Sequence, residues 1–319
     1  MNYFEERNKK AEFTIHRVLN DLPPFSVEYF YARETNASLV SLHNYSYDLR
    51  MFFRFLTTKV ELFRKDILLF SYKDLGKVTL EHIQLFVKSI ASTNGDKSIT
   101  RKINCLTSYF KYFKGQGKIS QIPTEYFKFP KIEDSPIITL TKSEAFNLLK
   151  VIEESPKTTL AKRDIVVIQL FLNTGLRISE LVGLDMQDVC IDSKSITVTR
   201  KGGNKEVVYL NDKITEILSA HIATQPKQST APLFKNKHDE RLSARMIQIT
   251  LKDYCYKAGI TKNITPHKLR STFATHIYTQ TKDIYATSYL LGHADINTTK
   301  RYADVNEKIK RDALAKLSF

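Results

Sequence analysis

The sequence predicts a mainly α-helical protein of two domains, with one small antiparallel β-sheet in the second domain. Apolar residues recur about every 3.6 positions along most of the chain, which is the spacing of one helix face. One stretch, 188–210, alternates instead and is interrupted by two polar turns. A stretch with three prolines and little periodicity, 122–140, separates the two helical regions. The length of 319 residues is sufficient for two domains with their own cores.

The first predicted domain covers residues 1–128 and is helical, with an N-terminal extension that reaches to about residue 22. We expect the segment LPPFSVEYF, within 21–36, to form an irregular entry. Helices are then expected after Ser38, Thr79 and Ser98, where the apolar repeats begin. One face of the third helix is basic, and we expect it to contact a polyanion. The basic residues of this face are Arg101, Lys102, Lys111 and Lys114.

A linker at 129–138 leads to the second predicted domain, 139–319. The first helix of this domain follows Thr141, which has the spacing of a capping box with Glu144. The two side chains of a capping box satisfy backbone N–H groups that the first helical turn leaves unpaired. A helix is therefore expected to begin here.

The middle of the second domain changes from helix to strand and back. The very apolar segment Arg163–Asn173 predicts a buried helix. The alternating stretch 188–210 predicts about three antiparallel strands, with Lys201 in the second turn. From Ile214 onward the pattern is helical to the end of the chain, and the last helix, about 306–317, has an apolar stripe.

The composition is typical of a globular protein without membrane spans. Hydrophobic residues make up 42% of the chain, and no apolar run approaches the about 18 residues that a transmembrane helix needs. The charged N-terminus lacks the apolar stretch of a secretory signal. Three widely spaced cysteines predict reduced, buried thiols in a cytoplasmic protein and argue against a metal site. They are Cys105, Cys190 and Cys255.

The basic character of the chain narrows the choice of partner. The net charge is +15, and the surplus extends over both halves. Basic charge spread over folded domains favours binding to a phosphate backbone. A solubilising surface is the alternative interpretation of the charge alone.

The segment TGLRISEL predicts a tight turn between two helices that carries an arginine. Thr174 and Gly175 end the apolar helix, and Arg177 lies in the turn. The planar fork of a guanidinium can bind two phosphate oxygens at once. For this segment alone, a surface pair between Arg177 and Glu180 is an equally good interpretation.

Two further segments supply phosphate-binding and nucleophilic residues. In HKLRSTFATH, His267 and Arg270 share one face near the start of a helix, where backbone N–H groups add partial positive charge. In LLGHADINTTKRY, Gly292 ends a helix, His293 follows, and Tyr302 lies nine residues later. A tyrosine hydroxyl can attack a phosphate. Each signal is weak alone, because HxxR pairs are common and the chain has sixteen tyrosines.

Together these segments resemble the motifs of the tyrosine recombinase (phage integrase-like) family in residue type, order and spacing. The resemblance covers about residues 141–305, and the helical region at 23–130 is more loosely similar to the family's core-DNA-binding domain. Length and domain plan resemble the Xer type, and the LPPFSVEYF entry is similar to the single-recombinase (XerS-like) members. The residues that match the catalytic positions are Arg177, Lys201, His267, Arg270, His293 and the nucleophile Tyr302.

The chain departs from the family pattern at three points. The lysine turn, KGGNK, is one glycine longer than usual, so that Lys205 is an alternative to Lys201. Ser271 stands where many members have a second histidine, and we expect this to be tolerated. We expect no additional arm-binding domain before the helical domain, and this expectation disfavours an arm-type integrase.

The resemblance implies DNA strand transfer through a 3′-phosphotyrosyl ester, without a metal or another cofactor. It also implies a double-stranded DNA recombination site and a homotetramer on two duplexes, joined by the C-terminal helix. It leaves open whether a second recombinase or a DNA translocase takes part. In the second domain, the expected base-contacting residues are Arg241, Arg245, Gln248 and Lys252.

The resemblance favours chromosome dimer resolution by a Xer-type enzyme. A mobile-element integrase or excisionase-type recombinase and a type IB topoisomerase share its chemistry, and both remain alternatives. A DNA-binding protein without catalysis is the alternative from another class. The complete set of two arginines, two histidines, a lysine and a tyrosine argues against it.

Overall fold

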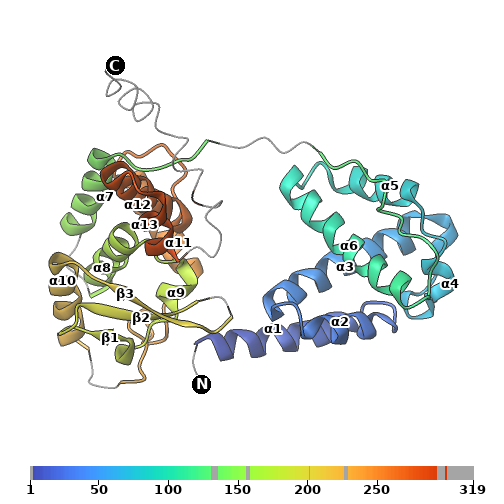
Figure 1. Cartoon of the computed structure of the whole chain (residues 1–319), viewed down its shortest axis with the longest axis horizontal. Helices are drawn as coiled ribbons and strands as arrows, with labels where there is room; N and C mark the ends of the chain where they lie inside the picture. The colour runs from blue at the N-terminus through green and yellow to red at the C-terminus, as the bar shows by residue number, and fades with distance from the viewer. Residues whose placement is uncertain are drawn as a thin grey trace, which may run out of the picture. The chain divides into compact units, whose positions relative to one another are not determined.

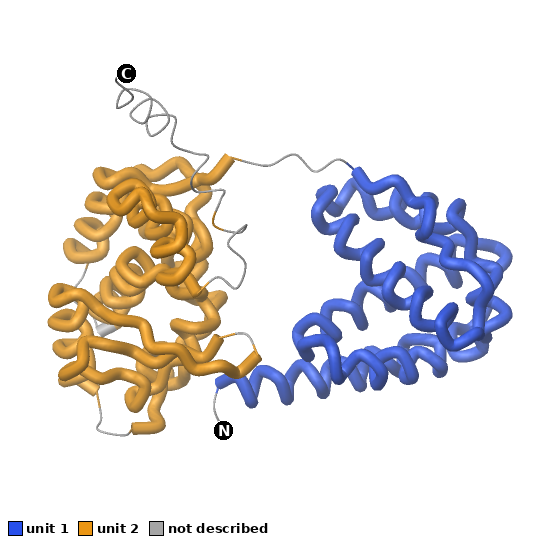
Figure 2. The backbone as a smooth tube through the Cα atoms, viewed as in Figure 1, with its two compact units in different colours: residues 1–134 blue, residues 135–319 orange. Residues whose placement is uncertain are grey.

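The computed structural model describes residues 3–130, 136–155, 159–200, 202–225, 229–292 and 299. The chain divides into two compact units, residues 1–134 and 135–319, which are coloured separately in Figure 2. The described residues are mainly helical, with one three-stranded antiparallel sheet in the second unit (Figure 1). The predicted fold class is therefore confirmed. No helix among these residues is long and apolar enough to cross a membrane.

The first unit is a helical bundle around the long helix α3. Helix α3 packs against α1, α2, α5 and α6. Its N-cap is Ser38, as predicted, and the Ser38 hydroxyl accepts a hydrogen bond from the Ser41 N–H. The helices of this unit are α1 (Tyr3–Leu19), α2 (Ser26–Glu34), α3 (Leu39–Lys59), α4 (Tyr72–Leu75), α5 (Leu80–Ile90) and α6 (Asp96–Gly115), with 3-10 turns at Glu61–Phe63 and Ile67–Leu69.

The prediction of an irregular N-terminal entry is wrong for most of its length. Only the residues between α1 and α2 are irregular, and SVEYF lies in α2. The preceding extension is also helical, because Ala11, Ile15 and Val18 form a narrow buried stripe on an otherwise charged helix. A helix with such a narrow apolar stripe has a low average hydrophobicity, although it keeps its helical periodicity.

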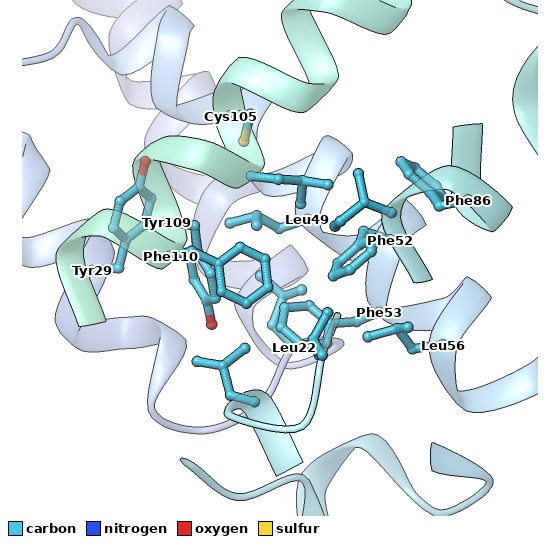
Figure 3. Close-up of a cluster of buried hydrophobic side chains, with 14 of the residues drawn as sticks. Leu22, Tyr29, Leu49, Phe52, Phe53, Leu56, Phe86, Cys105, Tyr109 and Phe110 are labelled. Atoms are coloured by element: carbon cyan, nitrogen blue, oxygen red, sulfur yellow. The ribbon is translucent and has the colours of Figure 1, made fainter. Parts of the chain in front are cut away.

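The core of the first unit is rich in aromatic side chains. Figure 3 shows Phe52, Phe53 and Phe110 together with Tyr29 and Tyr109, all of them buried. Ring pairs such as Phe52–Phe86 meet edge to face, at 5.2 Å between centroids, which is a favourable aromatic geometry. The two tyrosine hydroxyls keep hydrogen-bond partners, since Tyr109 pairs with Ser26 and Tyr29 donates to Ser108. Burial raises the pKa of Tyr29 to about 12.

The second unit is built around the apolar helix α8, which packs against α7, α10 and α12. Helix α7 begins with the predicted capping box, in which the Thr141 N–H donates to Glu144 and the Glu144 N–H donates to Thr141. The helices of this unit are α7 (Lys142–Glu154), α8 (Thr159–Thr174), α9 (Ile178–Val182), α10 (Asp212–Ala223), α11 (Ala244–Lys257), α12 (Pro266–Thr281) and α13 (Ile284–Leu291), with a 3-10 turn at Met186–Asp188.

The sheet has the order β1–β2–β3, with strands Val189–Cys190, Ser195–Thr199 and Lys205–Tyr209. In the longer hairpin, Ser195 pairs with Tyr209 and Thr199 with Lys205. Inward positions of β2 are apolar and buried, which fixes its register. Cys190 is exposed at the sheet edge, so the prediction of three buried thiols is wrong for this residue.

Candidate active site

Arg177 lies where predicted, in the turn between α8 and α9. The turn is possible because Gly175 has a φ of +63°, which favours glycine. Arg177 is the N-cap of α9, and its backbone N–H and Nη1 both donate to the buried Glu180 carboxylate, at 2.8 and 2.7 Å. Its side chain nevertheless stays 40% exposed. Arg177 and Glu180 therefore do pair, and the pair leaves the guanidinium accessible.

Arg270 is held inside the unit from the first turns of α12. Thr265 caps this helix and Pro266 begins it, as expected for a helix start. Arg270 is only 3% exposed. Its Nη1 donates to the Gly175 carbonyl and its Nη2 to the Leu291 carbonyl, both at 2.6 Å. Two backbone acceptors thus stabilise a guanidinium whose burial would otherwise be costly.

The end of α13 is the point at which these arginines meet. Arg177 Nη2 lies 3.4 Å from the Gly292 carbonyl, next to the Leu291 carbonyl that Arg270 uses. Gly292 caps α13 with a φ of +58°. Carbonyl groups at a helix C-terminus carry partial negative charge, so cations are favoured there. Two residues of separate sequence motifs are thereby brought together in space.

A third guanidinium, which the motif analysis did not identify, shares this position. Arg200 Nη1 donates to the Leu291 carbonyl at 2.7 Å, and its Nε lies 2.5 Å from Glu206. The sequence contained a signal for the inward position of Arg200. Ile196 and Val198 are the inward residues of β2, so the alternation of a strand directs Arg200 inward as well.

The remaining predicted catalytic residues are placed only in part. His267 lies in the first turn of α12, three positions before Arg270, and is exposed. Lys201, His293 and Tyr302 lie outside the described residues. Lys205, the alternative lysine, is the first residue of β3 and is exposed. In the described part of the chain, no three His, Cys, Asp or Glu side chains are grouped to hold a metal.

Helix α11 presents three of the four predicted base-contacting residues on one surface. Arg245, Gln248 and Lys252 are exposed and, with Tyr256 and the segment 263–266, line a cavity of about 700 Å³. The cavity combines two cations with amide and hydroxyl groups, together with Ile249 and with Asp253, whose carboxylate pairs with Lys257. Its chemistry suits a nucleic-acid backbone together with base edges.

Arg241 has a different position from the other three. It donates to the Val182 and Leu184 carbonyls at 2.9 and 3.1 Å and forms an ion pair with Asp185 at 2.5 Å. These bonds tie the segment before α11 to the end of α9. Arg241 therefore has an internal, structural role, and it does not belong to the surface that Arg245, Gln248 and Lys252 form.

A buried polar group holds α11 against α8. Arg163 donates to Asp164 at 2.9 Å through Nε, and the Tyr254 hydroxyl donates to the other oxygen of that carboxylate at 3.3 Å. Burial raises the pKa of Asp164. Burial and the neighbouring Asp164 raise the pKa of Tyr254 to about 12, so its hydroxyl remains a donor at neutral pH. The hydrogen bond from Tyr254 to Asp164 connects α11, whose other face is exposed, to α8.

The basic residues predicted on α6 also divide into two groups. Lys111 and Lys114 are exposed near the end of the helix. Lys102 is 7% exposed and pairs with the buried Asp48 at 2.9 Å. Arg101 pairs with the same carboxylate but remains partly exposed. Lys102 thus neutralises a buried charge, and it is not on the surface that the helical pattern predicted.

Comparison with known proteins identifies the family of the chain. Residues 139–308 match the model of the phage integrase family. The tyrosine recombinase XerC of Caldanaerobacter subterraneus subsp. tengcongensis is 31% identical over 97% of this chain and 90% of its own length. The tyrosine recombinase XerD of Staphylococcus epidermidis is 34% identical over 66% of this chain and 72% of its own.

Solved structures with the same fold include DNA complexes of recombinases. One is a XerH site-specific recombinase bound to a palindromic difH substrate, with a TM-score of 0.70 and 19% identity over 89% of this chain and 81% of the other. Another is a λ integrase dimer bound to a core site, with a TM-score of 0.68 and 18% identity over 92% of this chain and 81% of the other.

The fold, the paired arginines and the relatives define a class of enzymes that break and rejoin DNA. Within this class, the chain belongs to the phage integrase family, as a tyrosine recombinase of the Xer type.

Proposed function

We propose that this protein is a site-specific recombinase that cuts and rejoins DNA through a 3′-phosphotyrosyl intermediate, with Tyr302 as the nucleophile. The observation that supports this most strongly is the meeting of Arg177 and Arg270 at the end of α13. The chain continues from that point into His293, and Tyr302 follows nine residues later. A phosphate bound by the two guanidinium groups would thus lie at the point from which the chain continues to His293 and Tyr302.

The arginines would stabilise the charge that develops on the scissile phosphate. A phosphodiester has one delocalised negative charge, and attack adds charge to its nonbridging oxygens. Arg177, Arg270 and His293 would donate hydrogen bonds to these oxygens. Loss of one such donor typically slows a reaction about 10²–10³-fold.

The proton balance requires one base and one acid. The Tyr302 Oη–phosphorus bond forms while the phosphorus–O5′ bond breaks. The phenolic proton, with a usual pKa of about 10, passes to His267, and the leaving O5′ takes a proton from Lys201. The ester retains the energy of the original phosphodiester, so the reverse attack by a 5′-hydroxyl needs no nucleotide and no metal.

We assign DNA contacts to both units. The first unit would act as the core-DNA-binding domain, with Lys111 and Lys114 on its surface. Arg101 would contribute from the other end of α6, because its side chain stays 44% exposed although it pairs with Asp48. The second unit would add the exposed α11 residues Arg245, Gln248 and Lys252. Basic residues on both units agree with the distribution of the net charge of +15.

The relatives named XerC and XerD support chromosome dimer resolution, hence a role in chromosome partition during cell division, as the biological setting. The proposal includes a homotetramer on two duplexes that assembles through the C-terminal helix, and a cytoplasmic location. A DNA translocase is a candidate accessory partner. In this setting, the enzyme should recombine two chromosomal copies of one site and should not insert a mobile element.

The test is covalent trapping on a nicked DNA site, in which the short 5′-hydroxyl fragment diffuses away after cleavage. The wild-type protein should give a protein–DNA adduct on a denaturing gel, and Tyr302→Phe should bind the same DNA without an adduct. Sequencing the trapped DNA identifies the site and the polarity. An adduct that persists in Tyr302→Phe would falsify the assignment of the nucleophile.

The choice of the general acid is tested on the same substrate. Lys201→Ala should slow cleavage much more than Lys205→Ala, because Lys205 is paired with Thr199 in the sheet and exposed at the start of β3. The reverse order would transfer the role of the acid to Lys205.

A further inference from the structure

Arg200 closes the turn that contains the predicted acid, Lys201. Its backbone N–H donates to the Asn204 carbonyl at 2.8 Å, and its carbonyl accepts from the Gly203 N–H at 3.1 Å. Gly202 and Gly203 have φ values of +89° and +86°, which only glycine adopts without strain. The turn that joins β2 and β3 is therefore anchored at Arg200.

The Arg200 side chain connects this turn to three other elements. It donates to the Leu291 carbonyl of α13 at 2.7 Å and pairs with Glu206 of β3 at 2.5 Å. Its Nη1 also lies 3.6 Å from Glu180 of α9, the carboxylate that holds Arg177. One residue thus joins the lysine turn through its backbone and, through its side chain, contacts the partner of Arg177 and the carbonyl used by Arg270.

Gly292 leaves the space that this arrangement needs. A Cβ atom at Gly292 would lie 2.1 Å from the Arg200 Cζ, which is far inside van der Waals contact. Gly292 therefore suits both the positive φ and the close approach of the Arg200 guanidinium to the backbone, and a Cβ here would force the Arg200 side chain to move.

Arg200 does not have the character of a phosphate ligand. It has two carboxylate partners, Glu180 at 3.6 Å and Glu206 at 2.5 Å. A guanidinium neutralised in this way serves better as an anchor than as a binding group.

The geometry points to Arg200 as a positioning residue, which acts by holding the lysine turn against the end of α13. This inference rests on the proposed function, in which Lys201 protonates the leaving O5′. A misplacement of about 1 Å can slow a reaction about 10²-fold. Loss of the Arg200 side chain should therefore impair the proton transfer while the arginine site for the phosphate remains.

The test uses two nicked substrates of the same sequence, one with the natural O5′ at the scissile phosphate and one with sulfur in its place. With oxygen, the phosphorus–O5′ bond breaks and O5′ must gain a proton. With sulfur, the phosphorus–S bond breaks and a thiolate leaves unprotonated, because thiols have pKa values of about 8.5. A residue that acts through the acid is then no longer needed.

Arg200→Ala should cleave the oxygen substrate about 100-fold more slowly than wild type and the sulfur substrate at a rate close to wild type. Lys201→Ala should behave in the same way, whereas Arg177→Ala should be slow on both. Lys194→Ala, in the other turn of the sheet, is the control and should leave both rates unchanged, because the Lys194 side chain forms an exposed pair with Asp212.

Two results would overturn the inference: wild-type cleavage of the oxygen substrate by Arg200→Ala, or equal slowing on both substrates. If Arg200→Ala does not fold, Arg200→Lys replaces it, because lysine keeps the charge without the planar fork. That variant should show a smaller defect with the same recovery on sulfur. Failure of the proposed function itself is distinguishable, since Lys201→Ala would then cleave the oxygen substrate at the wild-type rate.

Discussion

Replacing Gly175 with alanine would place a methyl group where the Phe273 ring lies. The new Cβ would be 2.4 Å from Phe273 Cδ1 and 3.1 Å from Leu291 Cδ2. Phe273 and Leu291 belong to the same buried cluster, with Ala274, and Ile137 and Ile277 pack against it, so a methyl group here requires packed side chains to shift. Gly175 also has a φ of +63°, which a residue with a Cβ adopts only with strain.

Both effects can be estimated. A left-handed conformation costs a non-glycine residue about 1–2 kcal/mol. Extra atoms forced into a packed core cost about 1–3 kcal/mol, so Gly175→Ala should lower the free energy of unfolding by about 2–5 kcal/mol in total. Gly259→Ala isolates the first effect, because Gly259 has a φ of +68° and open space around its Cβ position. The control should therefore lose about 1–2 kcal/mol.

The assay is denaturant unfolding of the full-length chain, analysed for the transition of the second unit, to which both glycines belong. The double variant Gly175→Ala/Phe273→Leu should recover part of the loss, because the smaller side chain makes room for the methyl group. The Gly175 carbonyl also accepts a hydrogen bond from Arg270, so DNA cleavage should fall more in Gly175→Ala than in Gly259→Ala at temperatures where both are folded. Equal destabilisation by the two alanines would refute the packing argument.

Three other predictions concern the buried charges and the surface. Asp48→Ala should destabilise the first unit by about 3–5 kcal/mol in thermal or denaturant unfolding, because the buried Lys102 loses a partner. Asp21→Ala, which breaks exposed pairs, is the control and should cost less than about 1 kcal/mol in the same experiment. In DNA-binding titrations at several salt concentrations, Lys111→Ala should weaken binding and lower the salt slope by about 1, whereas Lys102→Met should change neither. Burial lowers the pKa of His221, so the folded state binds a proton at this residue less readily than the unfolded state does. Stability is therefore lost as the pH falls below the usual pKa of 6.5. In unfolding experiments, His221→Gln should lose less stability than the wild type between about pH 7 and pH 5.

Local signals in the sequence predicted the elements that local chemistry determines. The N-cap at Ser38 and the capping box at Thr141 were correct, because each joins groups only three residues apart. The hairpin was correct because strand alternation and two glycines in the turn act within a few residues. Helix α1 was not predicted as an element of its own, because its apolar stripe is narrow and lies among charged residues, and the segment was given only as an N-terminal extension of the helical domain.

Long-range pairs could not be predicted from the helical pattern. Lys102 is on α6, and its buried partner Asp48 lies 54 residues earlier. Arg241 contacts carbonyls 57 and 59 residues away. A basic residue on a helix is most often solvated, so only the folded chain distinguishes a surface cation from one that neutralises a buried carboxylate.

The candidate site shows the same division. Motif order singled out Arg177 and Arg270, although their common position arises from contacts with residues 115 and 21 positions further along. Arg200 has no place in those motifs. Its inward direction could have been read from the alternation of β2, but its partners on α9 and α13 could not.

The clustering of three arginines at one helix end has an electrostatic reason under the proposed function. The carbonyls of Leu291 and Gly292 are the negative end of α13, and alone they would repel a phosphate. Arg270 and Arg200 both donate to the Leu291 carbonyl, and Arg177 lies over the next one. The two carbonyls are thereby occupied before DNA arrives, and Arg177 and Arg270 supply the positive charge for the phosphate, since Glu206 and Glu180 neutralise Arg200. Because internal acceptors already hold these groups, little reorganisation is needed when charge develops on the phosphate, and this is the condition under which electrostatic stabilisation is most effective.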